Sequence, residues 1–170
     1  AGGGTPSIVG NKGTGIIIGV IDTGINRTHP SFANTNTGVV GVTFAEAFTI
    51  TNPRGSTKYG NCVANPANCS GKIIGLWDFT ASGSGTTTDA PDTNGHGTHT
   101  AGTAAGNPIK ITIPGGATPY TPTMSGVAPR ANIIAYKACN ATGCPGSMTL
   151  ASINQSVVDG VNVISYSIGG

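Results

Sequence analysis

One apolar run decides the fold of this chain: Gly15-Ile16-Ile17-Ile18-Gly19-Val20-Ile21-Asp22-Thr23-Gly24. The run has the length of a β-strand and ends abruptly in a carboxylate and a turn glycine. Strands that are apolar on both faces are typical of parallel sheets covered by helices. Three further runs predict strands, at Lys72–Phe79, Ala131–Ala138 and Val161–Ile168. We therefore expect an α/β fold, a parallel sheet flanked by helices, with the first strand at Gly15–Asp22.

A second stretch places a histidine at the start of a helix: Asp92-Thr93-Asn94-Gly95-His96-Gly97-Thr98-His99-Thr100-Ala101-Gly102. Its Gly, Ala and Thr residues suit a helix over about His96–Ala105 that is buried against other backbone. A further helix is predicted where Leu150, Ile153 and Val157 recur at helical spacing, because Gly160 then supplies a left-handed stop.

The remaining segments are expected to be irregular. The 170 residues are enough for one domain. Residues 1–14 are rich in Gly and polar residues, which predicts a loosely held terminus. Residues 25–70 are rich in Thr, Asn, Pro and Gly, with short strands at most around Val39–Phe44. Ile109–Pro122 reads as a surface loop.

Asp22 and His96 are the candidate catalytic residues. Ligand sites gather at the carboxyl ends of parallel strands, and a carboxylate there needs a partner. Asp22 taken alone fits an Asx turn, but with His96 at a helix mouth it fits a carboxylate that orients an imidazole. We expect the two side chains within hydrogen-bonding reach, the carboxylate facing one ring nitrogen.

The other histidines favour different interpretations. His96 and His99 are three residues apart and could share a helical face, so a metal-dependent hydrolase that uses Asp22, His96 and His99 is one hypothesis. The segment lacks the Glu of the H-E-x-x-H pattern, and no metal site is predicted. His99 is expected in the core or behind the site, and His29 in a turn.

Composition excludes several classes of partner. Eight basic and six acidic residues give a net charge of +2 without a basic cluster, so nothing indicates nucleic-acid binding. No stretch approaches the ~20 consecutive apolar residues of a membrane span. Charged residues make up only 8%, beside 28 Gly and 11 Pro, which favours many turns around buried strands.

Four cysteines fall into two close pairs, Cys62 with Cys69 and Cys139 with Cys144. Each pair lies in a stretch rich in Asn, Pro and Gly, where the chain can turn back on itself. We predict two local disulfides, which indicate an oxidising, extracellular compartment. A four-cysteine zinc site fits the C-x6-C and C-x4-C spacings badly. Four free thiols are the other alternative.

The motifs, in this order, resemble those of the subtilisin-like serine proteases, the subtilases. Val20–Ile25 resembles the aspartate motif of that family, and Asn94–Gly102 its histidine motif. Gly126-Val127-Ala128-Pro129 is similar to the lead into the next strand, and Asp159–Gly170 to the segment that borders the substrate cleft. The cysteines, with Lys72–Gly75 and Tyr136–Cys139, are similar to secreted subtilases that carry a protease-associated insertion.

The resemblance implies a serine endopeptidase with an Asp-His-Ser triad. His96 would be the general base and Asp22 its orienting carboxylate, while Ser167-Ile168-Gly169 would pair with an extended protein or peptide substrate. It implies no cofactor; a structural calcium ion is compatible with the family but has no recognisable position in the sequence. The protein would act outside the cell, without nucleic acid or membrane as partner.

Two features of the family are absent from these residues. No Gly-Thr-Ser-Met-Ala nucleophile segment occurs, and Ser125 in Thr123-Met124-Ser125-Gly126 lies before a strand rather than at a late helix start, so we reject it as the nucleophile. The oxyanion asparagine is also expected beyond Gly170. We therefore interpret 1–170 as the N-terminal portion of a catalytic domain, with a sheet incomplete at its C-terminal end.

Activity would then require the serine-bearing remainder of the parent protein, and residues 1–170 alone are expected to be inactive. The alternative is a non-catalytic peptide-binding or regulatory fragment of a subtilase, which would recognise extended peptides along an exposed strand.

Overall fold

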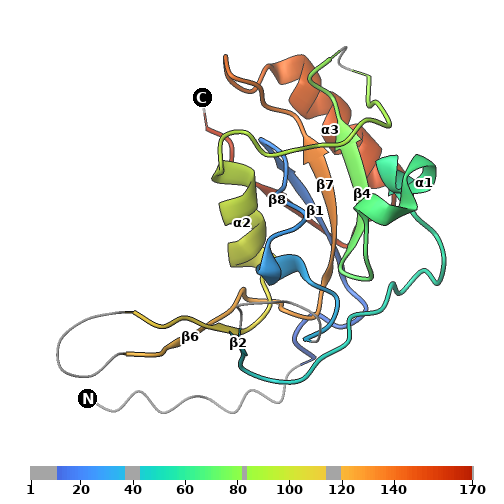
Figure 1. Cartoon of the computed structure of the whole chain (residues 1–170). Coiled ribbons are helices and arrows are strands. Elements are labelled where there is room, and N and C mark those ends of the chain that lie inside the picture. The colour runs from blue at the N-terminus through green and yellow to red at the C-terminus, as the bar shows by residue number, and fades with distance from the viewer. Residues whose placement is uncertain (1–10, 37–42, 82–83, 114–119, 170) are drawn as a thin grey trace.

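The computed structural model describes residues 11–36, 43–81, 84–113 and 120–169. Its centre is a sheet of parallel strands (Figure 1). In spatial order the strands are β3 (Tyr59–Gly60), β4 (Ile73–Asp78), β7 (Asn132–Lys137), β1 (Ile17–Asp22) and β8 (Val163–Tyr166). The expected α/β architecture is confirmed.

The register of the sheet determines where the functional edge lies. β1 pairs with β7 from Ile17 opposite Asn132 to Asp22 opposite Lys137, and with β8 on its other side. Because all these strands run the same way, their carboxyl ends meet at one edge. Asp22 is the last residue of β1 and lies at that edge.

Both faces of the sheet are buried, which explains the continuous apolar runs. Ile18 and Val20 pack with Ala101 and Ala105 of α2 (His96–Ala105). Ile17 and Ile21 point to the other face, in a cluster that includes residues of α3 (Gly146–Val158). Figure 1 shows the two helices on opposite sides of the sheet. Burying each such isoleucine contributes about 1.5–3 kcal/mol.

The smaller elements lie in the long connections. A second, antiparallel sheet contains β2 (Thr43–Phe44), β5 (Ile109–Lys110) and β6 (Thr123–Met124), and it extends as an arm in Figure 1. The short helices are α1 (Asn61–Ala64), η1 (Pro30–Phe32) and η2 (Pro66–Asn68).

The expected strands are present but one or two residues shorter at most ends, and α2 has the expected bounds. The expectation of a plain surface loop at Ile109–Pro122 was wrong in part, since its first two residues form β5, which pairs with β6 just after the range. Residues 114–119 lie outside the described residues. Of the strand expected at Val39–Phe44, the described part is β2. Residues 1–14 were expected to form a loose terminus. Residues 1–10 also lie outside the described residues, and residues 11–14 form a turn.

The cysteines form the two disulfides predicted, Cys62–Cys69 and Cys139–Cys144. The zinc and free-thiol alternatives are therefore wrong for the structure. Within the described part of the chain, no helix has both the length and the apolar character needed to cross a bilayer.

Candidate active site

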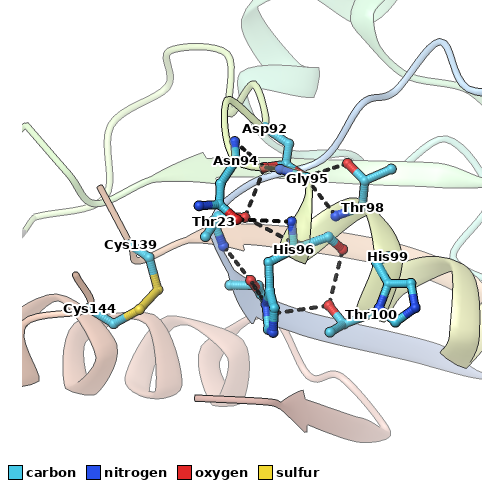
Figure 2. A network of polar contacts seen from close by, with 12 residues as sticks. Thr23, Asp92, Asn94, Gly95, His96, Thr98, His99, Thr100, Cys139 and Cys144 are labelled. Carbon is cyan, nitrogen blue, oxygen red and sulfur yellow. Dashed lines mark hydrogen bonds and ion pairs between the residues drawn. A yellow bond between two sulfur atoms is a disulfide. The ribbon is translucent and has the colours of Figure 1, made fainter. Parts of the chain in front are cut away.

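The two candidate catalytic side chains meet at the carboxyl edge of the sheet. His96 Nδ1 lies 2.8 Å from Asp22 Oδ1 (Figure 2). Asp22 is buried, with 1% of its side chain exposed, whereas 49% of the His96 side chain is exposed. The expected hydrogen bond is confirmed, and it joins a carboxylate sealed from water to an imidazole that solvent and other groups can reach.

Neutral donors hold the Asp22 carboxylate in place. The backbone N–H of Thr23 donates to Oδ1 at 2.7 Å, and the Thr100 hydroxyl donates to Oδ2 at 2.9 Å. The main-chain oxygen of Asp22 accepts from the N–H groups of Ala138 and Cys139, at the end of β7. A buried carboxylate is costly unless it is hydrogen-bonded, and these donors satisfy it while they fix its orientation.

α2 approaches the end of β1 closely because its first turn contains Gly97. A Cβ added to Gly97 would lie 2.2 Å from the main-chain oxygen of Gly24, so a larger side chain has no room. The N–H of Gly97 donates to the Thr23 hydroxyl at 2.8 Å. This close contact places His96, one residue earlier, beside Asp22.

Lys137 joins the two loops that carry the pair. Its ammonium donates to the main-chain oxygen of Thr23 at 2.5 Å and to that of Pro91 at 2.8 Å. The residue is 7% exposed. One buried lysine, opposite Asp22 in the sheet register, therefore connects the turn after β1 to the loop before α2.

This arrangement can carry out proton transfer. With Nδ1 bonded to Asp22, Nε2 is the nitrogen left to exchange a proton with another group. A carboxylate in this position holds one tautomer and stabilises the imidazolium that forms. The geometry therefore suits a general base that activates a hydroxyl.

The other histidines lie apart from this pair. The expectation that His99 is in the core or behind the site was wrong about the core, because its side chain is exposed at a hollow of about 520 Å³ beside α2. Ser125, rejected above as nucleophile, lines the same hollow. His29 is a turn residue as expected: its Nδ1 accepts from the N–H of Ser31 and caps η1.

Ser167, Ile168 and Gly169 directly follow β8, the neighbour of β1 in the sheet. They lie beyond the end of the strand, on the same edge as Asp22, and Ser167 and Gly169 are exposed. Their role in substrate binding stays a prediction.

The metal-dependent hydrolase hypothesis lacks a ligand cluster. Across 11–36, 43–81, 84–113 and 120–169, no three His, Cys, Asp or Glu side chains gather as a metal site, and Asp22, His96 and His99 do not form one. Figure 2 shows the Cys139–Cys144 disulfide beside the network around His96.

Comparison with known proteins agrees with this geometry. A model of the subtilase family matches residues 13–170. The chain belongs to the subtilase family. Among its relatives in Arabidopsis thaliana is subtilisin-like protease SBT1.4, 38% identical over 94% of this chain and 20% of the relative. Subtilisin-like protease SBT1.6 is 39% identical over 93% of this chain and 20% of the relative. This subtilase chain thus spans about a fifth of the length of the curated relatives it matches.

Sequence reasoning missed the residues that support the pair, namely Thr23, Asp92, Thr100 and Lys137. The helical spacing could have identified Thr100, because it lies four residues, about one turn, after His96 and therefore on the same face of the helix. Lys137 carried no local signal, since its acceptors are main-chain oxygens from two distant loops.

Proposed function

We propose that the protein carrying this chain is a secreted serine endopeptidase. The observation that supports the proposal most directly is the 2.8 Å bond between buried Asp22 and half-exposed His96, in a chain of the subtilase family. The nucleophilic serine and the oxyanion donors would come from residues outside 1–170.

In the proposed reaction, Nε2 of His96 accepts the proton of the serine hydroxyl as the oxygen attacks the peptide carbonyl. Asp22 keeps Nδ1 protonated and stabilises the imidazolium. His96 then returns the proton to the leaving amine, and an acyl-enzyme forms that water hydrolyses.

The substrate would lie extended along Ser167-Ile168-Gly169, at the same edge as the pair, where Ser167 and Gly169 are exposed. Two disulfides within the described residues support an oxidising, extracellular location.

Three preparations test the proposal at equal concentration: the full-length protein, its His96→Ala variant and residues 1–170 alone. We expect only the full-length protein to cleave a denatured protein substrate, and a fluorophosphonate to label one serine and abolish turnover. His29→Asn is the matched histidine control. An Asn side chain can still accept the Ser31 N–H that caps η1, so this variant should keep its activity.

Turnover by the His96→Ala variant would refute the assignment of His96 as the general base. Turnover by residues 1–170 alone would refute the assignment of the nucleophile to residues outside 1–170. Inhibition by a transition-metal chelator with no fluorophosphonate labelling would favour a metal-dependent hydrolase. Peptide binding without cleavage by the full-length protein would favour the non-catalytic alternative.

A further inference from the structure

Asp92 lies in the loop before α2 and binds the first turn of that helix. Its Oδ1 accepts from the N–H groups of Gly95 at 2.8 Å and Asn94 at 3.1 Å. Its Oδ2 accepts from the N–H of Thr98 at 2.8 Å and from the Thr98 hydroxyl at 2.5 Å. The residue at the N-cap position of α2, Gly95, has no side chain, and the first turn holds no acidic residue. Asp92 therefore supplies the negative charge that a helix N-terminus favours.

The same carboxylate also reaches the end of β1. The Thr23 hydroxyl donates to Asp92 Oδ1 at 2.8 Å, and that hydroxyl accepts from the N–H of Gly97. The N–H of Thr23 donates to Asp22 Oδ1, the oxygen that binds His96. One threonine thus connects Asp92 and Asp22. Figure 2 shows Thr23, Asp92 and Thr98 in one network on one side of His96.

We infer that Asp92 is a positioning residue for His96: it ties the first turn of α2 to Thr23 and so keeps the imidazole in register with Asp22. The inference rests on the proposed function, because positioning matters for catalysis only if His96 is the general base. Asp92 is not expected to touch substrate.

The chemistry of the network requires a carboxylate. Two N–H groups and one hydroxyl converge on Oδ1, and one N–H and one hydroxyl converge on Oδ2. A carboxylate is acceptor-only, whereas an amide would direct two N–H donors at Thr98. Burial acts to raise the pKa of Asp92, but hydrogen bonds from Thr98, Gly95 and Thr23 outweigh it and lower the pKa to about 2. The group stays ionised at any ordinary pH.

The neighbouring carboxylate, Asp89, offers a matched control. It lies three residues earlier in the same loop and pairs with Arg27 at 3.2 Å, at the protein surface. Asp89→Asn removes the same charge from this loop without touching the network, so it separates a long-range charge effect from positioning.

The test uses the full-length protein with Asp92→Asn, Thr23→Val, the double variant and Asp89→Asn. We expect Asp92→Asn to lower kcat about 10–100-fold with KM within about 3-fold, because a misplaced catalytic group loses rate rather than substrate binding. Thr23→Val removes the linking hydroxyl and with it the acceptor of the Gly97 N–H, but the bonds from Gly95 and Thr98 to Asp92 remain. It should lower kcat in the same way, and Thr23→Ser should recover most of it. The double variant should be about as slow as the slower single variant, because both break one connection.

A proton NMR measurement on the same samples does not depend on turnover. The proton between His96 Nδ1 and Asp22 should give a protected downfield resonance in the wild type that broadens in Asp92→Asn and Thr23→Val but not in Asp89→Asn. Three results would each overturn the inference. They are an unchanged kcat and resonance in Asp92→Asn, a loss of kcat in Asp89→Asn equal to that in Asp92→Asn, and losses of kcat that multiply in the double variant. If the wild type cleaves nothing while the resonance responds as expected, the proposed function fails and the positioning role stands.

Discussion

Lys72, immediately before β4, provides a quantitative test of how the fold tolerates a buried charge. The residue is 0% exposed, and its ammonium donates to the main-chain oxygen of Pro129 at 3.0 Å. Burial, assisted by repulsion from Arg130, lowers the pKa of Lys72 from 10.5 to about 7. The folded protein therefore holds this proton much more weakly than the unfolded chain does.

The size of the effect follows from the two pKa values. The difference between 10.5 and about 7 corresponds to roughly 5 kcal/mol at about 1.4 kcal/mol per pH unit. Between these values the unfolded chain binds more protons than the folded one, so the free energy of unfolding rises with pH. The cost of the buried charge is present in full below about pH 7 and disappears as the pH approaches 10.5.

We expect Lys72→Met to stabilise the protein by roughly 2–4 kcal/mol at pH 6, because methionine has no charge to bury and fills a similar volume. The loss of the bond to Pro129 offsets about 1 kcal/mol of the gain. The gain should shrink steadily as the pH rises from 7 to 10 and should reverse sign near pH 10.5. Urea unfolding at a series of pH values, with the disulfides intact, measures this.

Lys110→Met is the control, since Lys110 is an exposed lysine on β5. It should change stability by less than about 0.5 kcal/mol at every pH. Equal or lower stability of Lys72→Met at pH 6 would refute the reasoning, and so would a gain that does not depend on pH.

Two further substitutions test the packing around the site and the sheet. Gly97→Ala should destabilise the folded protein by about 1–3 kcal/mol and lengthen the bond between His96 and Asp22, because the new methyl would lie 2.2 Å from the main-chain oxygen of Gly24. Gly102→Ala is the control, since a Cβ there meets nothing within 4 Å and should have neither effect. Thermal unfolding of the two variants compares their stabilities. Asp159→Ala should cost roughly 2–5 kcal/mol in urea unfolding, because it leaves the buried Tyr136 hydroxyl, one of three donors to that carboxylate, without its acceptor. Asp159→Asn keeps one acceptor oxygen and should cost less, so equal losses in the two variants would contradict the hydrogen-bond explanation.

The strands and the catalytic pair could be predicted because their signals are local. Ile17–Asp22 is apolar on both faces because both faces are covered, and that pattern is visible in any short window. Asp22 ends a recognisable strand and His96 begins a recognisable helix, so the sequence predicts that both lie at the carboxyl edge of the sheet.

The supporting residues could not be predicted because their partners are distant in the sequence. Lys72 reads as the polar start of a strand, and only the fold covers its side chain with residues such as Pro129. Asp92 reads as one polar residue in a polar loop, and its bond to Thr23 spans 69 positions. His99 was expected in the core or behind the site, but its side chain is exposed on the face of α2 that borders the hollow.

The position of β1 in the middle of the sheet also has a consequence for synthesis on the ribosome. Ile17 pairs with Asn132, 115 positions later, and the neighbour on the other side is β8, still farther along the chain. At about 5–20 residues per second, the fully buried strand β1 of the nascent chain waits roughly 5–25 s for its first neighbour in the sheet. During that interval Asp22 has neither the amides of Ala138 and Cys139 nor a sheet to hold it. The catalytic pair can therefore form only after translation has passed β7, and a cell that makes this protein must keep β1 from associating with other chains until then.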